Sequence, residues 1–238
     1  MFIRSVFIVA MLALTAPAMA ADEEENGPWA GKAHLGYLAT SGNTDNSSLN
    51  TGLEIGYTAG QWQHVLDAQA INSSEENVTT AEAYNLGWKS ERNLSEKNFL
   101  FGRLDWRKDQ FSGYDIQFSQ VAGYGRRLID AEVHKLNAEV GVGARQSDLA
   151  DGSNENETIL SGGLDYTWQF SETADLTQVL AVESGSANTY FESVTALSAK
   201  LLGNLALVAS YTIKTNSDVP ALTDKTDMYT ALSLEYVF

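Results

Sequence analysis

The residues that could perform nucleophilic catalysis are few and scattered. The sequence of 238 residues contains three histidines and no cysteine. His34, His64 and His134 lie in three separate segments, and none falls in a pattern that would bring it to a serine and an orienting polar group. A serine hydrolase needs these groups within hydrogen-bonding reach of one another. The sequence therefore predicts no enzyme and no catalytic residue.

Acidic residues dominate the polar links between the patterned segments. Aspartate and glutamate outnumber lysine and arginine by 31 to 15, for a formal net charge of −16. Such a balance argues against nucleic-acid binding, which needs clustered basic residues. The acids of these links are Asp45, Glu75, Glu76, Asp109, Asp115, Asp148, Asp151, Glu155, Glu157, Asp218, Asp224 and Asp227.

These carboxylates have the oxygen ligands that Ca²⁺ and Mg²⁺ prefer. Residues 151–157, however, lack the ordered ligand spacing and central glycine of an EF-hand loop. We interpret the acidic links as a solvated rim that attracts divalent cations weakly and is screened by salt. The sequence predicts no specific metal site and no cofactor.

Charged residues also recur inside segments whose side chains alternate between polar and apolar. Projected as strands, these segments place sixteen charges on their polar faces. The acids are Glu54, Asp67, Asp105, Glu139, Asp165, Glu183, Glu192 and Glu235. The bases are Lys32, Lys89, Arg103, Arg107, Arg127, Arg145, Lys200 and Lys214. Equal numbers of acids and bases predict a polar interior in which opposite charges compensate one another.

The elements that must position these charges are β-strands. Alternation with a period of two indicates a strand with one apolar and one polar face. Most of the alternating segments have about the 9–11 residues that a tilted strand needs to cross a bilayer. They span 30–40, 47–59, 61–71, 79–90, 98–107, 116–128, 135–146, 158–170, 175–185, 190–201, 205–215 and 227–238.

Twelve such strands predict an all-β, transmembrane, antiparallel up-and-down β-barrel. A soluble sandwich or lipocalin-like barrel also alternates, but it would be apolar inside and charged outside. Here the polar faces are rich in glycine, serine, asparagine and threonine with isolated charges, as in a wet lumen. Short turns alternate with longer polar links, which are expected outside the cell. The longer links span 41–46, 72–78, 108–115, 147–157, 185–189 and 216–227.

The first residues resemble a secretory signal peptide. Arg4 precedes an apolar run over 6–14, and Ala18-Met19-Ala20 provides a small-residue cleavage site. We therefore expect a cleaved signal peptide over 1–20, an acidic periplasmic segment over 21–29 and the barrel over 30–238. Such a chain would be exported to the cell outer membrane.

Aromatic residues on the outward faces predict a membrane-interface girdle, because their rings are apolar while their O–H or N–H groups stay wet. They include Trp62, Tyr84, Trp88, Trp106, Tyr166, Trp168 and Tyr236. The last strand alternates and ends in Phe238. This ending resembles the signature by which the barrel-assembly machinery recognises its clients.

Several motifs resemble one family along the mature chain. They lie in residues 36–44, 181–185, 193–197, 211–212 and 216–220, and at the terminal Phe238. Together they look like the DUF481 family, whose members are often labelled as salt-induced outer-membrane proteins. The resemblance implies outer-membrane location and an osmotic or ionic link, and it supplies no catalytic or binding residues.

The sequence thus predicts a narrow channel for ions or small hydrophilic solutes. The alternative is a non-conducting structural or stress-response barrel with acidic, cation-attracting loops. Twelve strands fall between eight, which leave a filled interior, and sixteen, which leave an aqueous channel. Phe99 and Phe101 are expected to narrow the lumen, and no long internal loop is available as a plug. The expected partners are outer-membrane lipid, lipopolysaccharide and the assembly machinery.

Overall fold

The computed structural model describes residues 27–40, 46–76, 78–109, 112–220 and 223–238. The predicted signal peptide and nearly all of the predicted acidic segment lie outside these residues. Within them, no helix is long and apolar enough to cross a membrane.

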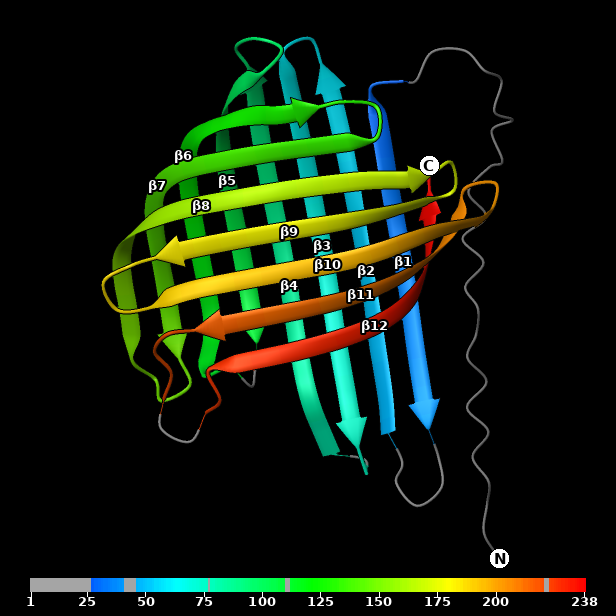
Figure 1. Cartoon of the computed structure of the whole chain (residues 1–238). Coiled ribbons are helices and arrows are strands. Elements are labelled where there is room, and N and C mark those ends of the chain that lie inside the picture. The colour runs from blue at the N-terminus through cyan, green and yellow to red at the C-terminus, as the bar shows by residue number, and fades with distance from the viewer. Residues whose placement is uncertain (1–26, 41–45, 77, 110–111, 221–222) are drawn as a thin grey trace, which may run out of the picture.

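Twelve strands form a closed barrel in which each strand pairs antiparallel with its neighbours in sequence, and β1 closes against β12 (Figure 1). The predicted all-β, twelve-stranded, up-and-down barrel is confirmed. The strands are β1 Trp29–Thr40, β2 Asn46–Ala59, β3 Trp62–Glu75, β4 Val78–Asn93, β5 Asn98–Asp109, β6 Tyr114–Asp130, β7 His134–Leu149, β8 Asn154–Ser171, β9 Ala174–Ser184, β10 Thr189–Leu202, β11 Leu205–Asn216 and β12 Thr226–Val237.

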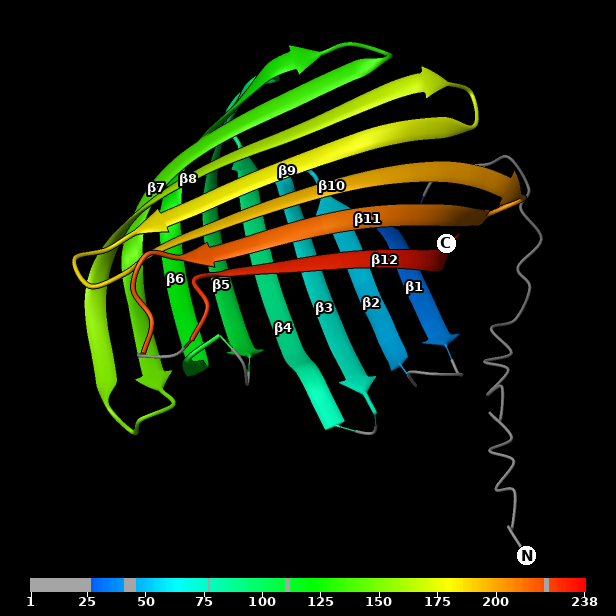
Figure 2. The same ribbon diagram turned by 60° about the horizontal axis from the view of Figure 1, so that its bottom comes forward.

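The strands are steeply tilted. In both ribbon views, β1 to β5 form one wall and β8 to β12 cross it at a large angle in the other wall (Figures 1 and 2). Closing a sheet into a barrel requires such a tilt. The even strand number places the start of β1 and the end of β12 at the same end of the barrel. We call this end the terminal rim and the opposite end the loop rim.

The turns at the terminal rim are short. Gly60 links β2 to β3 and Gly203 links β10 to β11, with φ of 59° and 55°. A residue with a Cβ is strained at such angles, so glycine permits the tight reversal.

Two of the predicted long loops are wrong, because the strands continue through them. β3 extends to Glu75, and only 76–77 separate it from β4. β7 extends to Leu149 and β8 starts at Asn154, so that 150–153 form the whole link. Backbone pairing does not require apolar side chains, and the ladder therefore continues through polar residues beyond the apolar segments. Several acids assigned to loops, Glu157 among them, thus lie on strands.

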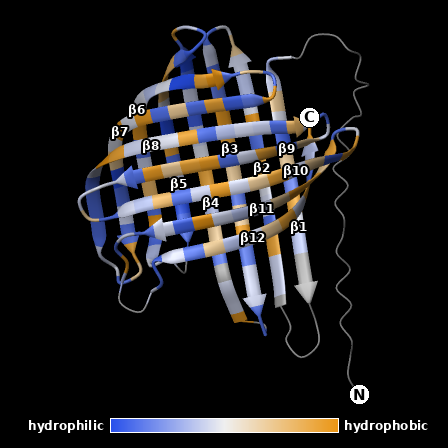
Figure 3. Cartoon of the chain, in the orientation of Figure 1, coloured by the Kyte–Doolittle hydropathy of each residue, from blue (hydrophilic) through white to orange (hydrophobic). Residues whose placement is uncertain are grey.

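Large apolar side chains remain exposed around the outer wall. They include Leu35, Leu53, Leu66, Leu86, Leu104, Val140, Val142, Leu160, Leu164, Leu197, Leu232 and Leu234. Figure 3 shows hydrophobic and hydrophilic residues alternating along the strands. An outward apolar belt over a polar interior is the pattern of a barrel that contacts lipid.

The predicted girdle residues lie on this outer wall. Trp62, Tyr84, Trp88, Trp168 and Tyr236 are 40–51% exposed, and the side chains of Trp106 and Tyr166 are half-buried.

Two histidines join the aromatic groups near the terminal rim. His64 stacks on Trp62 and Trp88, with ring centroids 6.0 and 6.2 Å away. His134 is the first residue of β7, and its Nδ1 lies 2.9 Å from the hydroxyl of Tyr166. Their position among outward aromatic rings leaves both histidines away from the interior.

Candidate functional site: the charged interior

Contacts between strands that are not neighbours identify the inward face. Lys89 on β4 bonds Glu139 on β7, and Arg107 on β5 bonds Glu183 on β9. In a closed barrel such side chains can meet only through the interior. Because side chains alternate between faces, the strand registers place the other predicted lumen charges on this face too.

Glu183 is the centre of the interior network. Its Oε1 accepts hydrogen bonds from Arg107 Nη2 at 2.8 Å and Arg103 Nη2 at 3.1 Å. Arg145 Nη1 lies 3.6 Å from the other carboxylate oxygen. The Glu183 side chain is 1% exposed, so three guanidinium groups compensate a carboxylate that is removed from bulk water. Arg103 also donates to Asp105 at 2.7 Å.

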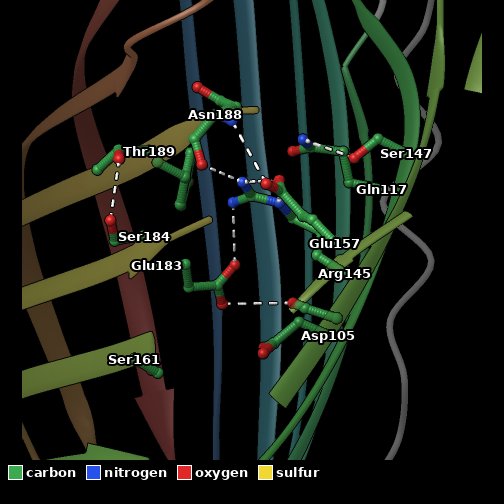
Figure 4. A network of polar contacts seen from close by, with 12 residues as sticks. Asp105, Gln117, Arg145, Ser147, Glu157, Ser161, Glu183, Ser184, Asn188 and Thr189 are labelled. Atoms are coloured by element: carbon green, nitrogen blue, oxygen red, sulfur yellow. Dashed lines mark hydrogen bonds and ion pairs between the residues drawn. The ribbon is translucent and has the colours of Figure 1, made fainter. Parts of the chain in front are cut away.

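Toward the loop rim, Arg145 joins this centre to the links at that end of the barrel. Its side chain is fully buried and donates to Glu157 Oε1 and to the carbonyl of Asn188 (Figure 4). Glu157 was assigned to a solvated acidic rim, and that assignment is wrong, because its side chain is 3% exposed and paired. The sequence placed Glu157 in a loop because it sits among polar residues.

Asn188 is a further organising residue that the sequence analysis missed. It is 1% exposed in the β9–β10 link. Its Nδ2 donates to Asn216 at 2.7 Å, and its Oδ1 accepts from the backbone N–H of Asp218 at 3.2 Å. In the sequence, a buried asparagine in a polar link looks the same as a solvated one, because no periodic pattern marks it.

The β11–β12 link crosses the mouth of the barrel. The hydroxyl of Tyr114, at the start of β6, donates to the carbonyl of Asp218 at 3.0 Å. Pro220 packs on Gly113, where an added Cβ would lie 2.5 Å from the proline Cδ. Since β5 and β6 lie opposite β11 and β12 in the barrel, these contacts tie opposite sides together. We call residues 217–220 the strap; the sequence predicted no such closure.

Toward the terminal rim, a second group of charges surrounds two phenylalanines. Lys89 bonds Glu139 and lies 2.9 Å from Glu91. Its Nζ is 5.5 Å from the ring centroid of Phe101, and the Arg127 guanidinium is 4.9 Å from that of Phe99. These distances are typical of cation–π contacts.

Glycines make room for both rings on the inner wall. A Cβ at Gly125 would lie 2.2 Å from the ring of Phe99, and one at Gly123 would lie 2.7 Å from that of Phe101. Phe99 and Phe101 are buried together with Val121 and Ile159. The two rings therefore pack against glycine-lined strands.

The opposite part of the inner wall is lined differently. Small side chains such as Ser210 and Ala231 recur on the inward register of β11 and β12. Among larger groups, His34 Nε2 lies 3.1 Å from Asn50 Oδ1, and Asn85 donates to Asp67 at 3.0 Å. Gln69 on β3 and Lys200 on β10 face inward yet are exposed, and Asp165 on β8 is an exposed exception on the other side. The packed side chains thus fill mainly the side formed by β4 to β9.

A small cavity lies among charged residues near the loop rim. Its volume is about 30 Å³, enough for a single water. Its charged lining residues are Arg107, Lys108, Asp109, Lys214 and Asp227. Tyr190, also in the lining, stacks under the Arg107 guanidinium at 4.4 Å.

The remaining predicted lumen charges have local partners or face open space. Lys32 lies 3.4 Å from Glu54. Glu192 accepts a hydrogen bond from the Tyr190 hydroxyl at 2.8 Å, and Lys214 Nζ lies 5.7 Å from the Tyr229 ring centroid. Glu235 is half-buried on the inward register of β12.

Among the described acids of the links, Asp151 has a defined environment. It accepts hydrogen bonds from the hydroxyl and the backbone N–H of Ser153 at 2.6 and 2.9 Å. The hydroxyl bond, with the backbone bond, lowers the pKa of the Asp151 carboxyl below its usual value. No group of three or more metal-binding side chains occurs among the described residues.

Comparison with known proteins places the chain in a family. The model of the family described as "Protein of unknown function, DUF481" matches residues 33–238. The chain belongs to the DUF481 family. A curated relative of this DUF481 barrel is the uncharacterized protein YdiY of Escherichia coli strain K12. It is 32% identical over 210 residues, which cover 88% of this chain and 83% of YdiY. The family expected from the motifs is confirmed.

Solved structures share the fold of this DUF481 barrel. The NanC porin superposes with a TM-score of 0.54 at 8% identity, covering 87% of this chain and 99% of the porin. The COG4313 outer membrane channel from Pseudomonas putida F1 gives 0.56 at 10% identity, covering 90% and 97%. At these identities the likeness shows the fold alone, and it is the fold of outer-membrane porins and channels.

Proposed function

We propose that this DUF481 barrel is a non-enzymatic outer-membrane channel for ions or small hydrophilic solutes. The observation that carries the proposal is the uneven filling of the interior. Charged side chains pack against β4 to β9, while small residues of β11 and β12 and the exposed Gln69 of β3 and Lys200 of β10 line the facing wall. This arrangement supports a narrow polar path beside the packed network. Residues 1–20 would direct export and be removed.

The narrow cavity near the loop rim would limit the size of the solute. Arg107 and Lys214 lie at this cavity together with Asp227, so both signs of charge face the path. Such a lining favours small hydrated ions or zwitterionic solutes over large neutral ones. Outside it, acidic residues such as Asp151 and Asp224 would concentrate cations at low ionic strength. This attraction would link the channel to salt conditions.

A second candidate is a non-conducting structural or stress-response barrel. The cross-interior ion pairs and the cavity of about 30 Å³ favour it, because a fully paired interior leaves little space for water. In this function the acidic rim would engage divalent cations and neighbouring lipopolysaccharide. In both functions the assembly machinery would receive the terminal strand with Phe238.

Single-channel recording of the refolded protein in planar bilayers separates the two candidates. A channel should show discrete openings, and Tyr190→Ala should raise their conductance about twofold or more by widening the narrow cavity. Tyr211→Ala is the matched control, because Tyr211 lies on the outward face. An inserted, folded protein that stays silent across potentials and salts, with Tyr190→Ala equally silent, would establish the second candidate.

A further inference from the structure

The seam that closes the barrel is paired over a short length. β1 and β12 share four register pairs, from Lys32↔Val237 to Leu35↔Leu234. Gly31 and Phe238 add two reciprocal backbone hydrogen bonds of 2.8 Å. By contrast, β1 pairs with β2 along its entire length, from Trp29 to Thr40. The barrel is therefore closed near the terminal rim and much less so toward the loop rim.

The two strands separate beyond this short seam. Both ribbon views show β1 and β12 meeting near the C-terminus and diverging away from it (Figures 1 and 2). Gly36 lies where they part, and a Cβ there would come within 2.5 Å of the Leu232 carbonyl oxygen. Among the described residues, 37–40 of β1 and 226–231 of β12 have no register partner across this seam.

These unpaired edges border the apolar belt. Tyr37 and Met228, on the outward registers of the two strands, are 65% and 63% exposed. Unpaired backbone N–H and C=O groups are not stable against hydrocarbon and need a polar partner. An open seam in this position gives lumen water or a polar head group access to the backbone edges.

An apolar groove lies on the outer wall beside the seam. It has a volume of about 700 Å³, and its lining comes from β1 to β4, β11 and β12, mostly from outward-register residues, with His34, Gly52, Gln69 and Asn85 of the inward register among them. Its lining includes the small side chains of Ala33, Ala68 and Ala70 and the larger ones of Leu53, Tyr84 and Leu234. The groove lies within the lipid-facing belt, so its natural occupant is a hydrocarbon chain of the surrounding membrane.

Hydrogen-bonding groups lie on the inner side of the same strands. His34 and Asn50 contact each other on β1 and β2, and Asp67 and Asn85 do so on β3 and β4. The wall next to the seam is thus apolar outside and polar inside. A molecule with one apolar tail and one hydrogen-bonding head matches both sides.

We infer that the β1–β12 seam is a lateral portal for a single-tailed amphiphile of the surrounding membrane. Its tail lies in the outer groove, and its head enters the polar interior between the diverging strands. This role goes beyond axial passage of ions or small solutes and does not require it.

The groove can be tested by electron paramagnetic resonance on the full-length mature protein refolded into phosphatidylcholine vesicles. The probe is a lysophosphatidylcholine with a nitroxide near the end of its tail. All barrels immobilise some boundary lipid, so the readout is the difference between variants. Ala68→Phe fills the groove, whereas the control Ala122→Phe changes an outward, exposed alanine on β6. The fraction of immobilised spin-labelled lipid in Ala68→Phe should be at most half of the fraction in Ala122→Phe. Equal spectra for wild type and both variants would overturn the inference.

The seam can be tested by disulfide trapping, because the chain contains no cysteine. Ala33→Cys with Tyr236→Cys joins a register pair of the closed part. Ala39→Cys with Thr230→Cys joins positions that the same register would bring together if the strands paired further. Oxidation in the vesicles should link the first pair at least tenfold faster than the second. Equal rates would show a closed seam and overturn the portal. Lipid immobilisation and disulfide trapping do not measure ion conduction. Both tests of the portal therefore remain decisive even if the barrel conducts no current.

Discussion

Glu183 on β9 accepts a hydrogen bond of 2.8 Å from Arg107 on β5, across the interior and past three intervening strands. Arg103 and Arg145 approach the same carboxylate. This single acid therefore ties two strands, β5 and β7, to β9 and neutralises charges that have little access to water.

We expect Glu183→Gln to lower the free energy of unfolding by about 3–5 kcal/mol, because it removes the main acidic partner of Arg107 and weakens the compensation of Arg103 and of the buried Arg145. Urea unfolding in vesicles, followed by tryptophan fluorescence, measures the change. Asp165→Asn is the control, since this inward carboxylate is exposed, and it should change stability far less. Equal losses in the two variants would contradict a special role for Glu183.

We expect Gly125→Ala to destabilise the barrel by about 1–3 kcal/mol, because the added methyl group overlaps the ring of Phe99. Gly102→Ala is the control, as a Cβ at Gly102 meets no atom within 4 Å. Adding Phe99→Leu to Gly125→Ala should recover part of the loss in urea unfolding. An additive double variant would show that the ring does not need the glycine.

We expect Tyr114→Phe to loosen the strap by about 1 kcal/mol, the usual contribution of one hydrogen bond. Hydrogen exchange followed by mass spectrometry should show roughly fivefold faster exchange in peptides that cover 217–220. Tyr124→Phe removes a hydroxyl that donates to Asn98 near the terminal rim, and it should leave the strap unchanged. Unchanged exchange in Tyr114→Phe would mean that Pro220 and Asn188 hold the strap without it.

We expect Gly31→Val to slow closure of the barrel, because a Cβ at Gly31 would lie 2.6 Å from the ring of Phe238. The folded fraction after refolding into vesicles, read as the heat-sensitive band on gels, should fall at least twofold. Phe238→Ala in the same background should restore folding in vitro, where no assembly machinery is present. A Gly31→Val protein that folds like wild type would contradict this packing.

The alternation of side chains was enough to predict the strand number, the closed barrel and the faces of the strands. The prediction succeeded because a one-residue slip would exchange lipid-facing and interior residues. The alternation of polar and apolar residues therefore determines which side chains of each strand face inward. The ends of β3, β7 and β8 were not predicted, since polar residues such as Glu157 continue a ladder without changing the pattern.

Alternation says little about which interior charges meet. Arg145 and Glu157 are direct neighbours across β7 and β8, and sequence registers could have paired them. Lys89 with Glu139 and Arg107 with Glu183 meet across the interior, which depends on strand tilt and barrel curvature. The strap and Asn188 lie in links, where no periodicity marks a buried residue.

The uneven distribution of ties around the wall has a mechanical consequence. Ion pairs brace the strands from β4 to β9, whereas β1 and β12 are held by four register pairs and the Gly31–Phe238 contact. Lateral tension in the membrane would therefore strain the barrel unevenly, with the β1–β12 edge yielding first and the braced wall moving as one body. Osmotic swelling, which stretches the envelope, would act on this DUF481 barrel as a pull on its weakest edge.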